Sequence, residues 1–145
     1  MSLNDVKVAE YLGIFFAGGQ GTMWDFSNSD RINTLTAAFY ESGHPVWAVC
    51  HEPVALTEVK LSNGENLVKG KQIAAFTNAE EKAVGADTHM PFLLETRLTA
   101  KGVKVVSSGL FQEYAVRDDL LITGQNPALA DKIAELFLKA LKNEP

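Results

Sequence analysis

Residues 46–53 read VWAVCHEP, an apolar run that gives way at Cys50 to His51, Glu52 and Pro53. Four apolar residues in succession indicate a buried strand, and a proline in the first turn is typical of a helix that follows it. A strand that turns abruptly into a helix projects the side chain at the turn out of the sheet, beside the unpaired amides of the helix. This position favours a thiolate, so Cys50 is the first candidate for chemistry.

Two interpretations stay open for Cys50, the only cysteine of the chain. A single cysteine is commonly a small buried hydrophobe. The neighbouring His51 favours a nucleophile instead, because a histidine acts as the general base of a cysteine when the two side chains meet in the fold.

The composition is that of one globular domain. The 145 residues are 46% hydrophobic and 21% charged, and no linker, internal repeat or low-complexity tract divides residues 1–145. A net charge of -5 without a cluster of basic residues argues against nucleic acid as a partner. Because no apolar run has the length of a membrane span and the first residues lack a signal-peptide pattern, we expect a cytoplasmic protein with no membrane partner.

Strand and helix patterns alternate along the chain. Residues 13–17 (GIFFA) predict a buried strand that ends in a glycine loop, and residues 27–39 predict a capped amphipathic helix that leads to the Cys50 strand. A strand, a helix and a second strand in this order predict a parallel crossover unit. Asn126 and Pro127 predict the start of a final helix with an apolar stripe. The remaining predicted elements are a short helix at 54–59, a helix at 91–100, and strands at 73–76, 104–106, 114–116 and 120–122.

Five sequence blocks together resemble one family: FFAGGQGTMWDF at 15–26, VWAVCHEP at 46–53, LVKGKQIAAFTNAEE at 67–81, VGADTHMPFLLETRL at 84–98 and LLITGQNPA at 120–128. They are similar to the ThiJ/PfpI superfamily, and within it to the branch of heat-inducible chaperone-like proteins and glutathione-independent glyoxalases. The resemblance implies an α/β fold, a flavodoxin-like, class I glutamine amidotransferase-like three-layer sandwich with a mostly parallel sheet. It implies neither a metal nor a cofactor.

The resemblance also implies a set of site residues. Cys50 takes the place of the nucleophile and His51 that of its base partner, with Glu81, or its neighbour Glu80, as the acid that orients the histidine. The backbone at Gly18 and Gly19 takes the place of the oxyanion site. Each of these has an ordinary alternative, since acidic pairs after strands are common on surfaces and turn glycines need no chemistry. Trp24 and His89 are candidates for lining a small-molecule pocket or for plain core and surface positions.

The chain departs from the family pattern in two places. The family's N-terminal strands are absent before residues 13–17, which implies an N-terminally incomplete domain lacking those strands. The strand at 13–17 then lies at an unpaired apolar edge of the sheet, so we expect a homo-oligomer that covers this edge. Glu52 stands where the family has glycine, and its carboxylate is expected to raise the pKa of Cys50.

Three functions follow as hypotheses. The first is a cysteine-dependent, glyoxalase- or deglycase-like conversion of methylglyoxal-type oxoaldehydes to hydroxy acids, with a small carbonyl compound as substrate. The second is a non-enzymatic chaperone or cysteine redox sensor, and the third is a cysteine peptidase or amidase.

Overall fold

The computed structural model describes residues 2–17, 19–127 and 130–142. Short 3₁₀-helices, labelled η, alternate with α-helices and strands. In chain order the elements are η1 (Leu3–Asp5), η2 (Val8–Glu10), β1 (Ile14–Phe16), α1 (Thr22–Asp25), η3 (Phe26–Asn28), α2 (Asp30–Glu41), β2 (Val46–Val49), η4 (Glu52–Leu56), β3 (Gln72–Ile73), α3 (Asn78–Ala83), α4 (Leu94–Ala100), β4 (Lys104–Val105), β5 (Ala115–Asp118), β6 (Leu121–Gly124) and α5 (Ala130–Leu141).

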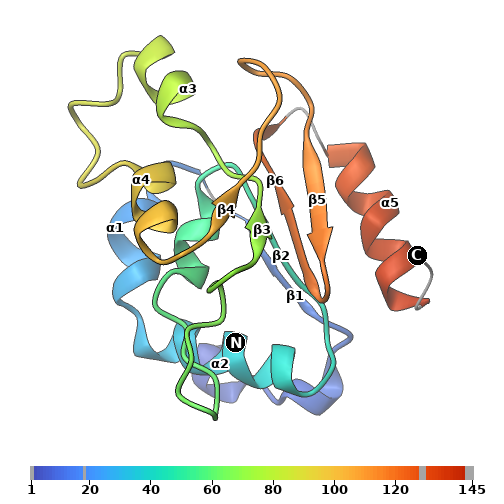
Figure 1. The fold of residues 1–145 in the computed structure, drawn as a ribbon. Coiled ribbons are helices and arrows are strands. Elements are labelled where there is room, and N and C mark those ends of the chain that lie inside the picture. Colours follow the sequence, from blue (N-terminus) through green and yellow to red (C-terminus); the bar gives the residue numbers. More distant parts are fainter. Residues whose placement is uncertain (1, 18, 128–129, 143–145) are drawn as a thin grey trace.

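A four-stranded sheet with the order β1-β2-β6-β5 forms the centre of the fold (Figure 1). β1, β2 and β6 run parallel, and β5 pairs antiparallel with β6. The hairpin between β5 and β6 turns at Asp119, whose φ is 58°. A separate pair, β3 and β4, is parallel. The predicted α/β fold with a mostly parallel sheet is confirmed, and β1 lies at one edge of this sheet.

The strand β2 is buried on both faces because each face packs on a different helical layer. Val46 and Ala48 join one core cluster with Leu35 of α2. Trp47 points to the opposite face, where it packs with Ile122 and with Ala140 of α5. Figure 1 shows α5 on one side of the sheet and α1, α2 and α4 on the other. The sheet therefore lies between two helical layers.

Gly13 fixes how closely the chain before β1 approaches β2. A Cβ atom at this position would lie 2.5 Å from the ring of Trp47 and 2.7 Å from the carbonyl oxygen of Pro45. Both distances are shorter than a real carbon atom tolerates, and the second group is backbone. Only glycine fits at position 13, because the Trp47 ring occupies the space that a side chain there would need.

The predicted strand at 73–76 is shorter than expected. Only Gln72 and Ile73 pair with β4, because the next amides have other partners. The Ala74 amide donates to the Thr123 hydroxyl over 2.9 Å, and the Phe76 amide donates to the carbonyl of Cys50. The segment therefore runs on to the carboxyl end of β2 instead of extending its own ladder.

Residues 77–81 form the start of a helix, α3, where no helix was predicted. Thr77 caps it: its hydroxyl accepts from the Glu80 amide, and the Glu80 carboxylate accepts from the Thr77 amide. This reciprocal pair is a capping box, and Thr and Glu three residues apart are its sequence signal.

The predicted helices differ in their bounds from the observed ones, and the helix expected at 27–39 is α2 at Asp30–Glu41. The helix expected at 54–59 is η4 and begins earlier, at Glu52, and the helix expected at 91–100 begins at Leu94. The final helix is described as Ala130–Leu141, and residues 128–129 before it lie outside the described part, so the cap expected at Asn126 stays a prediction. The side-chain amide of Asn126 donates to the carbonyl of Gln112 over 2.7 Å. Leu136 and Ala140 pack on the sheet as expected, and the side chains of 133 and 137 lie outside the described part.

Candidate active site

Cys50 lies at a left-handed bend between β2 and η4. Its φ is 62°, a region that costs a residue with a side chain about 1–3 kcal/mol. Hydrogen bonds hold the bend on both sides: the Cys50 amide donates to the Gly124 carbonyl over 2.9 Å, and the Cys50 carbonyl accepts from the Phe76 amide over 2.8 Å. The side chain is only partly buried. The bend thus presents the sulfur at the carboxyl ends of β2 and β6, where open parallel sheets bind their ligands.

Cys50, His51 and Glu81 form a hydrogen-bonded chain. The Sγ atom of Cys50 lies 3.1 Å from Nδ1 of His51, and Nε2 of the same imidazole lies 2.7 Å from Oε2 of Glu81. His51 is 1% exposed and Glu81 3%. If Nε2 carries the proton that Glu81 accepts, Nδ1 has a free lone pair facing the thiol. This is the arrangement of a nucleophile, a general base and a carboxylate that orients the base.

Two further side chains position this chain of groups. The ring of Phe76 lies 4.5 Å from the imidazole of His51 at an interplanar angle of 33°, which fixes the plane of the base. The amide of Gln20 donates to Oε1 of Glu81 over 3.2 Å, so both carboxylate oxygens have partners. Gln20 was not among the predicted site residues. The sequence feature that could have identified Gln20 is that it is the single polar side chain within the glycine loop that follows β1.

The thiol of Cys50 is neutral at rest. Burial and, to a smaller extent, the charge of Glu52 together raise its pKa to about 12, although the backbone amide of His51 acts to lower it. The expectation that the bend favours a thiolate is therefore wrong. η4 is a 3₁₀-helix of 5 residues, too short to offset burial and a neighbouring carboxylate. Attack by this thiol requires that His51 take its proton.

Glu52 is a second buried acid at the bend. It is 3% exposed, and burial raises its pKa to about 7, against the weaker effect of its own backbone N–H. At neutral pH the carboxyl is divided between its protonated and ionised forms. The expectation that Glu52 raises the pKa of Cys50 is confirmed in direction.

Glu80 points away from His51, so Glu81 alone of the two glutamates contacts the imidazole. Glu80 is fully buried and accepts hydrogen bonds from Thr77, Phe111 and Gln125. Burial acts to raise its pKa, but these hydrogen bonds outweigh burial and lower it. Glu80 therefore stays ionised and supports the surrounding loops.

The other predicted site residues lie apart from this chain of groups. Gly18 is outside the described residues. The Gly19 carbonyl accepts from the Thr22 hydroxyl over 2.8 Å, Trp24 on α1 is 49% exposed, and His89 is exposed, with Nδ1 3.3 Å from the Thr88 hydroxyl. Within the described residues, no hydrogen bond or ring contact joins Gly19, Trp24 or His89 to Cys50, and their roles stay predictions.

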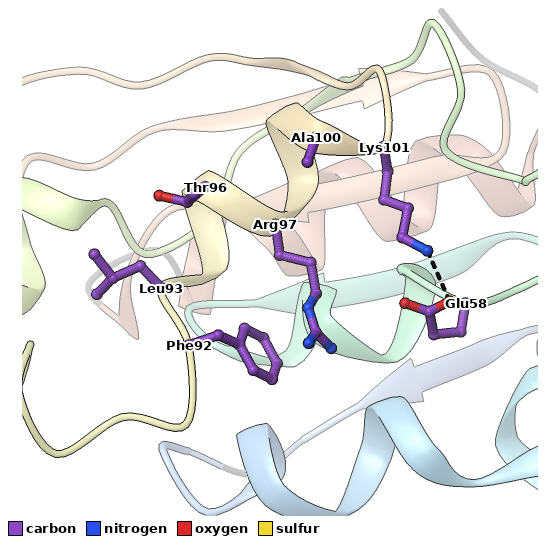
Figure 2. Close-up of a pocket in the computed structure, with 7 residues that line it drawn as sticks. All are labelled: Glu58, Phe92, Leu93, Thr96, Arg97, Ala100 and Lys101. Atoms are coloured by element: carbon purple, nitrogen blue, oxygen red, sulfur yellow. Dashed lines mark hydrogen bonds and ion pairs between the residues drawn. The ribbon is translucent and has the colours of Figure 1, made fainter.

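A shallow groove of about 400 Å³ is lined by α4, by the residues on either side of it and by Glu58, which follows η4 (Figure 2). Arg97 lies over the ring of Phe92, 3.3 Å from its centre, and Lys101 pairs with Glu58 at 2.8 Å. The groove holds no nucleophile, so Cys50 remains the centre of the candidate site.

Two other kinds of site have no basis in the described residues. No three histidine, cysteine or acidic side chains there are placed to hold a metal ion. None of the helices in 2–17, 19–127 or 130–142 is long and apolar enough to cross a membrane.

Comparison with known proteins identifies the family. The profile of the DJ-1/PfpI family matches residues 1–140. The chain belongs to the DJ-1/PfpI family. The resemblance found in the sequence blocks is thereby confirmed.

Two yeast members of the family are named glutathione-independent glyoxalases. A probable glutathione-independent glyoxalase of Schizosaccharomyces pombe is 32% identical over an alignment of 145 positions that covers 97% of this chain and 65% of the relative. A glutathione-independent glyoxalase of Saccharomyces cerevisiae is 33% identical over an alignment of 148 positions that covers 97% of this chain and 62% of the relative. The chain thus spans less than two thirds of the length of these relatives.

Solved structures of the family share the fold. The Rapid Encystment Protein of Francisella tularensis has a TM-score of 0.93 at 40% identity and covers 97% of this chain and 63% of its own. Glyoxalase III of Candida albicans has a TM-score of 0.88 at 30% identity, over 95% of this chain and 60% of its own.

Proposed function

We propose that this chain carries the active site of a glutathione-independent glyoxalase, which converts methylglyoxal-type 2-oxoaldehydes to 2-hydroxy acids. The observation that carries the proposal is the chain of contacts from Cys50 through His51 to Glu81. The names of the yeast relatives and of the Candida structure support it.

The first step forms a hemithioacetal. His51 takes the thiol proton at Nδ1 as the sulfur of Cys50 attacks the aldehyde carbon, C1, whose oxygen becomes an alkoxide and then a hydroxyl. Because Nε2 of His51 lies 2.7 Å from Glu81, the carboxylate stabilises the imidazolium that forms. A thiol with a raised pKa makes this base assistance essential.

The second stage is an internal redox reaction. A proton leaves C1, the electron pair of the C–H bond forms the C1–C2 double bond, and the C2 carbonyl oxygen gains a proton, which gives an enediol. A proton is then added at C2 while the C1 hydroxyl loses its proton and becomes the thioester carbonyl. C1 becomes a thioester and C2 an alcohol, so C1 is oxidised and C2 is reduced without an external electron acceptor. Water then cleaves the thioester and releases the hydroxy acid and the free thiol. His51 is placed to move the protons at the sulfur side of this sequence.

Of the alternatives, a cysteine redox sensor fits the site less well. Redox-sensing cysteines depend on a low pKa, whereas burial and Glu52 raise that of Cys50. A peptidase or amidase would use the same three side chains, so only a substrate test separates it from a glyoxalase.

The test is incubation with methylglyoxal in D₂O without glutathione, followed by proton NMR. We expect lactate to accumulate, with deuterium at C2 in the fraction of molecules whose transferred proton exchanges with solvent. Release of labelled peptides or amides in a parallel assay, without lactate, would replace the proposal with the hydrolase alternative. Suppression of aggregation of a model substrate without lactate formation would favour the chaperone alternative.

A further inference from the structure

The loop between β4 and β5 is held by buried polar side chains. Residues 108–114 cross the same end of the molecule as α3 (Figure 1). Glu80, Gln125 and Asn126 are each at most 2% exposed and bond this loop at successive backbone groups. Two backbone amides of the loop donate to these side chains: that of Ser108 donates to Gln125, and that of Phe111 donates to Glu80. Two carbonyls of the loop accept from side-chain amides: that of Gly109 from Gln125, and that of Gln112 from Asn126. The Tyr114 carbonyl accepts from the backbone amide of Gln125.

Phe111 is strained at the centre of this loop. Its φ is 54°, a left-handed conformation that is an outlier for a bulky residue. The Phe111 amide donates to Oε1 of Glu80 over 2.9 Å, which holds the residue in this conformation. Strain of this kind persists only where the surroundings enforce it, and such positions cluster at functional sites.

The protein uses this buried network to present an apolar side chain to solvent. Phe111 is 47% exposed and its neighbour Leu110 52%. The exposed half of the Phe111 ring contributes no hydrophobic stabilisation to the fold, since that stabilisation is proportional to the apolar area removed from water. A ligand that covers the exposed half of the ring explains the arrangement.

One ring, that of Phe76, lies between Phe111 and the catalytic His51. Its ring centre is 6.3 Å from that of Phe76, and the ring of Phe76 packs on His51 at 4.5 Å. The Phe76 amide also bonds the Cys50 carbonyl. Phe76 itself is 7% exposed, so Phe111 is the outermost ring of a row that begins at the imidazole.

We infer that Phe111, fixed by Glu80, is a specificity residue that forms an apolar wall beside Cys50 and selects carbonyl substrates with an aromatic or large apolar substituent. The inference rests on the proposed function, whose reacting carbonyl lies at Cys50. Offset or edge contacts between aromatic rings add to the energy of burial. Phenylglyoxal is therefore a better substrate than methylglyoxal in kcat/KM, and glyoxal, which lacks a substituent, is the poorest.

The first test compares kcat/KM for phenylglyoxal and methylglyoxal in the wild type and in Phe111→Gly. Glycine adopts a φ of 54° without strain, so this substitution removes the ring and keeps the loop. We expect the phenylglyoxal preference to fall about tenfold, to return in Phe111→Tyr, and to stay unchanged in Leu110→Ala. An unchanged preference in Phe111→Gly, or an equal fall in Leu110→Ala, overturns the inference.

A second measurement is independent of glyoxalase activity. N-phenylmaleimide and N-methylmaleimide both alkylate the single thiol, and the ratio of their rates reports an apolar wall beside Cys50. We expect the phenyl compound to lose its advantage in Phe111→Gly and to keep it in Leu110→Ala. If the wild type makes no lactate but the ratio falls, the proposed function fails and the apolar wall stands. If lactate forms and the ratio does not change, only the wall is refuted.

Discussion

Nε2 of His51 lies 2.7 Å from Oε2 of Glu81, and both side chains are almost fully buried. The carboxylate comes from the first turn of α3, 30 residues further along the chain than the histidine. This contact sets the tautomer of the imidazole and leaves Nδ1 for the thiol of Cys50.

Glu81→Gln tests the orienting role. The amide keeps the shape of the side chain but provides no negative charge for the imidazolium, so kcat/KM for methylglyoxal is expected to fall about 10²- to 10⁴-fold. Gln20→Ala is the matched control, because it removes the partner of the other oxygen, Oε1, and is expected to cost much less. Equal losses in the two variants would show that the carboxylate acts only through packing.

Glu52→Gln tests the electrostatic effect on the thiol. Since the Glu52 charge raises the pKa of Cys50, the variant is expected to ionise at lower pH and to be alkylated by iodoacetamide faster at pH 8. A decrease of one pKa unit would give about tenfold more thiolate. The measurement is the alkylation rate as a function of pH, and a pKa equal to or above that of the wild type would contradict it.

Glu52→Gln also tests how the buried carboxyl affects the pH dependence of stability. Burial raises the pKa of Glu52 from 4.5 to about 7, so the folded state holds its proton more tightly than the unfolded state. Protonated Glu52 therefore contributes its full stabilisation of the folded state below the unfolded pKa, and this contribution is lost as the pH rises through about 7. Glu52→Gln should therefore raise the free energy of unfolding relative to the wild type more at pH 8 than at pH 5, by at most about 3 kcal/mol. Urea denaturation at the two pH values measures this, and an equal change at both would rule out the buried ionisation.

Gly13→Ala tests the close approach to Trp47. The added methyl group would meet the indole ring and the Pro45 carbonyl, and overpacking of this kind costs about 1–3 kcal/mol. Gly21→Ala is the matched control, because no atom lies within 4 Å of its Cβ position and its φ is -56°. Urea denaturation should separate the two variants, and equal stabilities would mean that the backbone moves freely at Gly13.

The edge strand predicts self-association. β1 pairs on one side only within the described sheet, and Phe15 in its centre is 54% exposed. Apolar edges of this kind pair with other chains, so we expect an oligomer by light scattering and dissociation on Phe15→Lys. A monodisperse wild-type monomer would refute the prediction.

The sequence was most informative where local pattern and tertiary packing agree. The run that becomes β2, the bend at Cys50 and the helix α2 were predictable because an apolar strand, a cap at Ser29 and an apolar stripe act together. The family resemblance supplied Glu81, since residues so far apart in sequence reveal no contact by pattern alone. The capping box of α3 is visible in the spacing of Thr77 and Glu80, although no helix is predicted there from the sequence.

Other features depend on tertiary contacts that no local pattern encodes. The raised pKa of Cys50 arises from burial and from Glu52. The side-chain amide of Asn126 bonds the loop at Gln112, 14 residues earlier. Phe111 adopts its left-handed conformation because Glu80, 31 residues earlier, accepts its amide.

The most direct test is lactate formation from methylglyoxal, without glutathione, by the wild type and by Cys50→Ser side by side. A hydroxyl is far less readily ionised than a thiol, so the account predicts steady lactate formation by the wild type and none above background by the variant. Lactate formation at the same rate in both proteins would contradict it and remove Cys50 from the reaction.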